Sequence, residues 1–143
     1  MSESNPERQI YTPPMNPPGP IPGLGELCQL WGEEGIRDLV SRFYDRIPDS
    51  KIRKMFPKNL DLAKQKQADF IIQVTGGKPH YSQNYGPPRM RMRHFPFVID
   101  EEARMEWIRC YTEALDEADF SEDSKRIFSS FLESFSRWMV NSI

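Results

Sequence analysis

The sequence predicts an all-α domain that follows a proline-rich N-terminal extension. Apolar residues recur at helical spacing wherever the periodicity is strong, and helix-capping residues precede several of these stretches. No alternating segment competes: the nearest, at 89–93, is flanked by Pro88 and Pro96 and is too isolated to build a sheet. We therefore expect residues 1–23 to form the extension and residues 24–143 to form one helical domain.

The extension, called the N-terminal arm below, contains many prolines, which forbid helix continuation and favour extended backbone. They are Pro6, Pro13, Pro14, Pro17, Pro18, Pro20 and Pro22. The sequence leaves open whether the arm packs back on the domain through its apolar residues, which are Ile10, Tyr11, Met15 and Ile21.

The first part of the domain predicts two helices and a turn. A short helix, which Gly32 and Gly35 break, presents Leu24, Leu27, Cys28 and Trp31 on one face. A second helix ends near Pro48 and carries a stripe of Leu39, Val40, Phe43, Tyr44 and Ile47. Asp49 or Ser50 then caps a single turn that places Ile52, Met55 and Phe56 before Pro57.

Three further helices are predicted, separated by one long loop. Asn59 caps the first, which ends at Gly76 and Gly77 and has an inward stripe of Ala63, Gln67, Phe70, Ile71 and Val74. Residues 76–90 hold too many glycines and prolines for a regular element, and so long a loop is usually functional. Asp100 and Ser121 cap the last two helices, whose apolar faces are Ala103, Trp107, Ile108, Tyr111 and Leu115, then Phe128, Phe131, Phe135, Trp138 and Met139.

Composition argues against several classes of protein. A formal net charge of -2 gives no basic footprint for a phosphate backbone, so we expect no nucleic-acid partner. No apolar run is long enough to span a bilayer and the first residues lack a signal-peptide pattern, so we expect a soluble, cytoplasmic protein. Cys28 and Cys110 lie within helical apolar patterns, which favours buried thiols over a disulfide.

Polar residues interrupt the apolar stripes at Tyr44 and Gln67. Either the amide caps a neighbouring backbone group and the phenol reaches solvent, or both face a bound polar ligand. His94, taken alone, is more often a packed side chain than a metal ligand. A site made of protein ligands alone needs several of them, whereas haem needs a single axial imidazole. The alternating Arg89, Arg91 and Arg93 form either a solvated face or partners for haem carboxylates.

Five segments in combination resemble the group II truncated haemoglobins. They are Val-Ser-Arg-Phe-Tyr at 40–44, Met-Phe-Pro at 55–57, Gly-Gly with a following Pro and Tyr-Ser at 76–82, Arg-Met-Arg-His-Phe-Pro-Phe at 91–97, and Trp-Ile-Arg-Cys at 107–110. Their order and spacing match the family from about Leu27 to Ser142. Two features depart from the family pattern: the N-terminal arm has no counterpart, and Gly32-Glu33 stands in place of a glycine pair.

The resemblance implies a globin-like two-over-two helical sandwich enclosing haem b. His94 is then the proximal iron ligand and Phe56 stacks on the haem face. A distal cluster of Tyr44, Gln67 and Trp107 donates hydrogen bonds to a diatomic ligand. The resemblance adds five further pocket residues, which are Ala63 in place of the usual distal histidine, Phe70 along the haem edge, and Tyr81, Arg91 and Arg93 beside the propionates.

The function implied is reversible binding of O2 and of other diatomic ligands such as CO or NO. An alternative is a haem redox enzyme, either a nitric oxide dioxygenase or a peroxidase-like protein. That enzyme needs a separate reductase, because the chain has no segment typical of a flavin or nicotinamide domain. A third interpretation is a cofactor-free helical interaction module whose arm recruits a partner. The sequence does not distinguish a monomer from a homodimer.

Overall fold

The computed structural model of the protein describes residues 8–143, and Pro6 of the predicted arm lies outside them. The helices are α1 (Leu27–Asp45), α2 (Leu60–Val74), α3 (His80–Tyr85), α4 (Met90–Arg93), α5 (Glu101–Glu117) and α6 (Glu122–Met139), with short 3-10 turns at Leu24–Glu26, Ile47–Asp49 and Arg53–Met55. The described part of the chain contains no strand, so the predicted all-α class is confirmed.

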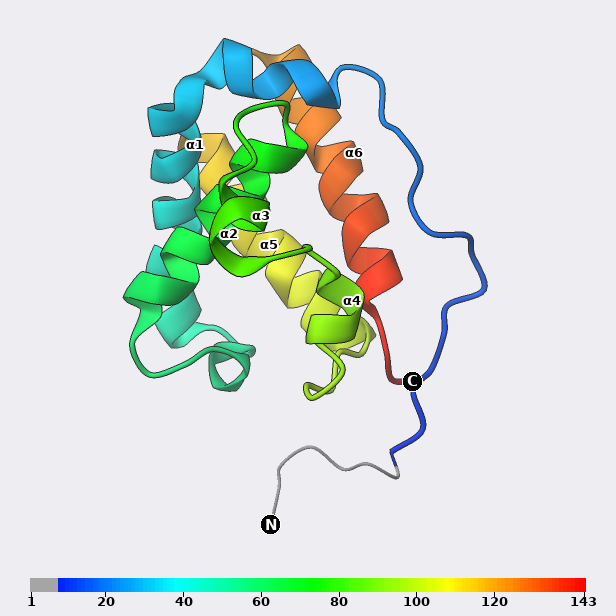
Figure 1. The fold of residues 1–143 in the computed structure, drawn as a ribbon. Coiled ribbons are helices and arrows are strands. Elements are labelled where there is room, and N and C mark those ends of the chain that lie inside the picture. Colours follow the sequence, from blue (N-terminus) through cyan, green and yellow to red (C-terminus); the bar gives the residue numbers. More distant parts are fainter. Residues whose placement is uncertain (1–7) are drawn as a thin grey trace.

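Two helix pairs form the two-over-two sandwich. The helices α1 and α2 pack against each other, α5 packs against α1, and α6 packs against α5. Figure 1 shows α1 and α2 on one side, α6 on the other and α5 passing between them. The apolar stripes predicted for α1 meet here: Leu39, Val40 and Phe43 are fully buried. Burial of these stripes joins the two pairs into one core.

The predicted break in the first helical region is a kink rather than a gap. Gly32 has a φ of 76° and a ψ of 157°, which are not helical angles, and helical backbone resumes directly after it. A side chain at such a φ is strained, so glycine at this position allows the kink. Gly35, the second predicted breaker, lies within the helix.

Side-chain caps form where the sequence predicts them at three helices. The side chain of Asn59 accepts from the Asp61 amide, that of Asp100 from Ala103, and that of Ser121 from Ser124. The predicted cap at Asp49 or Ser50 is wrong. The turn Arg53–Met55 has no side-chain cap, and the Ser50 hydroxyl instead donates to the Ile47 carbonyl oxygen at 2.8 Å.

The expectation of an irregular loop at 76–90 is also wrong, because α3 forms within it and α4 begins at its last residue. The breakers sit at the ends of these short helices: Pro79 precedes α3, and Gly86, with a φ of 86°, follows it. Contacts with α2 hold α3 in place. The Gln73 amide nitrogen donates to the Ser82 hydroxyl at 2.8 Å and its oxygen accepts from the Ser82 amide at 2.9 Å. Tertiary contacts thus stabilise helices too short to persist alone.

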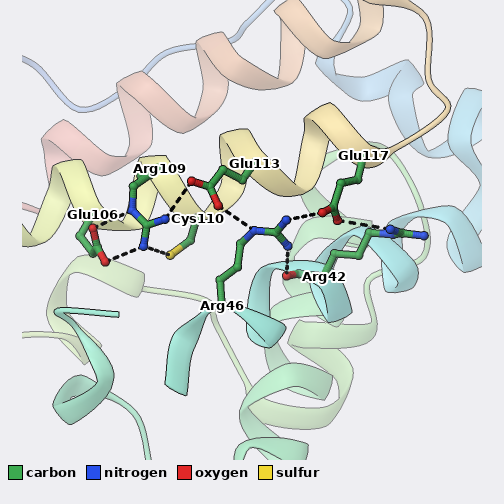
Figure 2. Close-up of polar contacts among 7 residues, drawn as sticks. All are labelled: Arg42, Arg46, Glu106, Arg109, Cys110, Glu113 and Glu117. Carbon is green, nitrogen blue, oxygen red and sulfur yellow. Dashed lines mark hydrogen bonds and ion pairs between the residues drawn. The ribbon is translucent and has the colours of Figure 1, made fainter. Parts of the chain in front are cut away.

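A ladder of arginines and glutamates joins α1 to α5 on the outside of the sandwich (Figure 2). Arg46 donates to Glu113 at 3.1 Å, and Arg109 donates to the same carboxylate at 2.9 Å. Glu106 is the least exposed acid of the ladder, with a side chain 9% exposed. Its hydrogen bonds to the Arg109 guanidinium lower the pKa of its carboxyl to about 2.

The N-terminal arm packs back on the domain, which answers the question left open by the sequence. Residues 8–23 form neither helix nor strand, and the Tyr11 amide donates to the Asn141 carbonyl oxygen at 3.0 Å. The side chains of Ile10, Tyr11, Met15 and Ile21 are all half-buried. Among residues 8–143, no helix is long and apolar enough to cross a membrane. Both cysteines are buried free thiols, as predicted.

Candidate functional site

A cavity of about 690 Å³ opens between the two helix pairs. Its volume is within the range of sites that hold a small organic ligand. Of the ten site residues predicted from the sequence, nine line it: Tyr44, Phe56, Ala63, Gln67, Phe70, Tyr81, Arg93, His94 and Trp107. The tenth, Arg91, is not among the lining residues. Residues far apart in the sequence therefore meet at one cavity.

His94 follows α4 directly and has a defined tautomer. Its Nδ1 lies 2.6 Å from the Met90 carbonyl oxygen, which can only accept a hydrogen bond, so Nδ1 carries the proton. Burial lowers the pKa of the imidazole, and the positive charge of Arg93 lowers it further. The neutral ring therefore keeps the lone pair of Nε2 free, which is the form of histidine that ligates a metal.

A hydrogen-bonded chain of polar groups connects α1, α2 and α5. The Tyr44 hydroxyl donates to Gln67 Oε1 at 3.4 Å, and Gln67 Nε2 donates to the Tyr111 hydroxyl. Burial raises the pKa of both phenols well above the usual range, so both stay protonated. The polar residues that interrupt the stripes of α1 and α2 thus satisfy each other inside the protein.

Tyr111 is a member of this chain that the sequence analysis treated only as part of an apolar face. It is fully buried and is not among the cavity-lining residues. Its ring stacks on Phe43 with centroids 4.1 Å apart. The signal that could have found it is its spacing: Tyr111 lies one turn after Trp107 on the same face of α5, beside the position where Gln67 needs a partner.

Trp107 contributes an unused donor to the cavity. None of the hydrogen bonds found within residues 8–143 involves its indole N–H, and the residue lines the cavity. Its ring is held in place by aromatic neighbours, with centroid distances of 5.1 Å to Tyr111 and 6.1 Å to Phe135. A fixed indole with a free N–H at a cavity wall is suited to donate to a polar ligand atom.

The remaining walls are aromatic and apolar. Phe56 contacts the Tyr44 ring edge-on at 5.6 Å, and Phe70 contacts the Tyr81 ring in the same manner at 5.9 Å. Ala63 leaves its part of α2 without a bulky side chain. Several other residues that were not predicted also line the cavity, and they include Met55, Lys66, Met90, Arg104, Phe131, Ser136 and Met139. Two of the unassigned lining residues are charged, Lys66 and Arg104, and Arg104 is paired with Glu101 at 2.7 Å.

The two predicted propionate-side arginines lie in different places. Arg93 lines the cavity with its guanidinium 5.4 Å from the centroid of the Tyr81 ring. Arg91 instead donates to three main-chain carbonyl oxygens, those of Tyr11, Trp138 and Val140, at 2.6–2.7 Å. The structure therefore brings Arg93, but not Arg91, to the cavity.

The donor set of the cavity fits haem. No group of three or more His, Cys, Asp or Glu side chains in the described residues is placed to hold a metal ion. The cavity does supply one neutral imidazole and apolar aromatic walls, which is what a haem needs from a protein because the porphyrin supplies four nitrogens itself. A two-over-two helical sandwich around such a pocket defines a truncated globin.

Comparison with known proteins identifies the family. The model of the bacterial-like globin family matches residues 29–141, and the chain belongs to this family. It is therefore a haem-binding globin. The chain is 35% identical over 111 residues to the group 2 truncated hemoglobin YjbI of Bacillus subtilis. The matched region covers 77% of this chain and 84% of that protein.

Solved structures agree with this assignment. The structure of a truncated oxygen-avid haemoglobin from Bacillus subtilis superposes with a TM-score of 0.77 at 33% identity and covers 80% of this chain and 98% of its own. That of a haemoglobin from the thermophilic phototrophic bacterium Chloroflexus aurantiacus has a TM-score of 0.77 at 31% identity, covering 86% and 99%. The predicted family and fold are confirmed.

Proposed function

We propose that the cavity holds haem b on His94 and that the protein binds O2 and other diatomic ligands there. The observation that carries the proposal is the neutral His94, whose Nδ1–H is bonded to the Met90 carbonyl so that Nε2 is free at the wall of a 690 Å³ cavity. Haem, when bound, supplies the ferrous iron that takes the diatomic ligand. The protein supplies the axial imidazole, the hydrogen-bond donors and a dry environment.

The buried polar chain has two possible directions. In the structure, Tyr44 donates to the Gln67 oxygen and the Gln67 nitrogen donates to Tyr111, which leaves the Tyr111 hydroxyl proton without an acceptor within residues 8–143. Rotating the Gln67 amide by half a turn exchanges its oxygen and nitrogen. Tyr111 then donates to Gln67, Gln67 donates to Tyr44, and the Tyr44 proton is free to point into the cavity.

A ligand with an acceptor atom favours the second direction. The ligand atom accepts a hydrogen bond from the Tyr44 hydroxyl. Every hydroxyl of the chain then has an acceptor, which is the preferred state of buried polar groups. Trp107, which also lines the cavity, donates its indole N–H to the same ligand. In this proposal Tyr44 and Trp107 hold the ligand directly, whereas Gln67 and Tyr111 set the direction in which Tyr44 donates.

Other wall residues have simpler roles in the proposal. Phe56 and Phe70 exclude water, and Ala63 leaves room for small ligands to pass. Arg93 and Tyr81 hold the haem carboxylates, since guanidinium and phenol groups both donate to carboxylate oxygens. The Arg93 Nη2 donates to the Tyr85 and Pro87 carbonyl oxygens, so its other N–H groups would bind the carboxylate. Arg91 is not assigned this role, because it does not line the cavity and its guanidinium is bonded to three carbonyl oxygens. We also propose a cytoplasmic location, which suits a protein with two free thiols.

The test is the visible absorption spectrum of the purified, reduced protein with and without carbon monoxide. We expect a Soret band that shifts with carbon monoxide and is lost or altered in His94→Ala. His80→Ala is the matched control, because His80 is paired with Glu33 and does not line the cavity. An unaltered spectrum in His94→Ala refutes the axial role, and no Soret band after added haem refutes the haem pocket.

A second candidate is a haem redox enzyme that consumes nitric oxide or peroxide. The cluster of Tyr44, Gln67 and Trp107 favours it, because several donors around one ligand slow its release and suit turnover better than delivery. Such an enzyme requires a separate reductase. Steady-state consumption of nitric oxide or peroxide by the purified protein with a chemical reductant distinguishes turnover from binding alone.

A further inference from the structure

The N-terminal arm, which the proposed function leaves without a role, reaches the backbone that follows His94. The Arg8 guanidinium donates to the carbonyl oxygen of Phe95 and, at 3.2 Å, to that of Phe97. It also donates to the main-chain and side-chain oxygens of Asn141, both at 3.4 Å. One side chain of the arm thus joins the segment after His94 to the end of the chain.

Asn141 holds the same segment from the other side. It is fully buried, and its amide nitrogen donates to the carbonyl oxygens of His94 at 3.2 Å and Phe97 at 2.9 Å. Its amide oxygen accepts from the Ile99 amide at 2.9 Å, and its main-chain amide donates to the Ile99 oxygen at 2.9 Å. A buried asparagine with every group bonded fixes the backbone around it.

Arg91 provides a third tie. From α4 it donates both to the arm, at the Tyr11 oxygen, and to the C-terminal end of α6, at the Trp138 and Val140 oxygens. Figure 1 shows the arm passing the C-terminus, where the red end of the chain leaves α6 beside α4. Both ends of the described chain therefore converge on the helix that precedes His94.

The segment needs these ties because its own packing is weak. The helix α4 has four residues, too few to be stable by itself. Three side chains in this region are exposed: Met92 by 52%, Phe97 by 39% and Val98 by 53%. Ile99 is the one buried apolar side chain of residues 94–99, so hydrogen bonds to the carbonyl and amide groups of the segment supply much of what holds it.

We propose that the arm and the chain end form a strap, made by Arg8, Arg91 and Asn141, that fixes the backbone of residues 94–99 and thereby the orientation of the His94 ring. Arg8 and Asn141 are then positioning residues for the imidazole. The inference rests on the proposed axial role of His94. It assigns the proline-rich arm to the haem pocket as a functional part of the globin domain.

The strap affects both how the proposed iron–histidine bond forms and how readily haem is lost. With the strap in place, the backbone holds Nε2 at one distance and tilt, so the bond forms without reorganising the segment. Without Arg8, two carbonyl oxygens lose a charged donor and the segment opens more often. The imidazole then takes a range of orientations, and haem leaves more readily.

The experiment uses the full-length haem-loaded protein in four forms: wild type, Arg8→Ala, Arg8→Lys and the control Gln9→Ala. Gln9 is an exposed neighbour on the same arm. Amide hydrogen exchange of Phe95, Phe97, Val98 and Ile99 is measured alongside the iron–histidine stretching band of the ferrous protein. We expect exchange in Arg8→Ala to be roughly tenfold faster, which is the size of effect for a lost hydrogen bond to a charged group. Exchange in Arg8→Lys should be intermediate, because lysine keeps the positive charge but lacks the several N–H donors of the planar guanidinium. Gln9→Ala should match wild type.

The stretching band should broaden or shift in Arg8→Ala, and haem transfer to an excess of apomyoglobin should be faster. Asn141→Ala should show larger changes of the same kind, and Arg8→Ala remains the decisive variant if Asn141→Ala does not fold. Unchanged exchange and an unchanged band in Arg8→Ala would overturn the strap. A wild type without any iron–histidine band would instead overturn the proposed axial role of His94, so the two failures are distinguishable.

Discussion

Replacing Tyr111 by phenylalanine removes one hydroxyl group from the protein at a point outside the cavity wall. The ring keeps its stacking on Phe43 and its edge contact with Trp107 at 5.1 Å, so the core is preserved. The change removes the end of the buried polar chain. The rotated Gln67 amide then has no donor for its oxygen, so the direction in which Tyr44 donates to a ligand loses one hydrogen bond, and the unrotated amide loses the acceptor of its nitrogen.

The expected magnitude follows from the kind of bond removed. The bond between Gln67 and Tyr111 joins two neutral groups, for which the net contribution is about 0.5–1.5 kcal/mol. The ligand-free structure already has a bond between these groups, so only the difference between the two directions of the chain affects the rate. A difference of this size makes O2 dissociation about 2- to 12-fold faster. Tyr44→Phe removes a donor that touches the ligand itself and should have an effect at or above the upper end of this range.

Stopped-flow displacement of O2 by carbon monoxide measures the dissociation rate. The decisive comparison is a double-mutant cycle with Gln67→Leu, because Tyr111 acts only through Gln67. Tyr111→Phe should speed O2 release in wild type and leave it unchanged in the Gln67→Leu background. Tyr85→Phe is the matched control, since the Tyr85 hydroxyl bonds Asp69 at 3.3 Å outside the chain. Equal effects of Tyr111→Phe in both backgrounds, or none in either, would refute the reasoning.

Three further outcomes are expected. Trp107→Phe should speed O2 release about tenfold, through loss of a free indole donor, with little change in Soret absorbance; an unchanged rate contradicts its distal role. Glu106→Gln should lower the free energy of unfolding at pH 7 by about 1–3 kcal/mol, measured in urea. The folded pKa of about 2 lies below the ordinary 4.5, so this stabilisation is complete above pH 4.5, and the difference from wild type should vanish as pH falls toward 2. Gly76→Ala should destabilise the fold by at least about 1–3 kcal/mol, because Gly76 has a φ of 97° and a Cβ there would overlap the Gly25 carbonyl. Gly19→Ala is the control, because a Cβ at Gly19 meets open space, and its thermal midpoint should be close to that of wild type.

Local features of the chain were predictable because local physics determines them. Asn59, Asp100 and Ser121 cap helices through groups only two or three residues away, so their roles are visible in the sequence. The kink at Gly32 follows from a backbone angle that glycine accepts. The resemblance to a family added what local rules do not contain, namely that Tyr44 and Gln67 face one cavity with His94.

The amino-acid sequence was enough to predict the long helices and their inward faces, because the spacing of apolar residues encodes them. The family resemblance added nine of the residues that line the cavity. The partners that these side chains find depend on the tertiary structure. Tyr111 pairs with Gln67 across 44 positions, and Arg91 bonds carbonyl oxygens of the arm and of the chain end. The helices α3 and α4 form amid prolines because neighbouring elements hold them. Such choices depend on which distant groups remain unsatisfied once the chain is folded, and no local pattern records that.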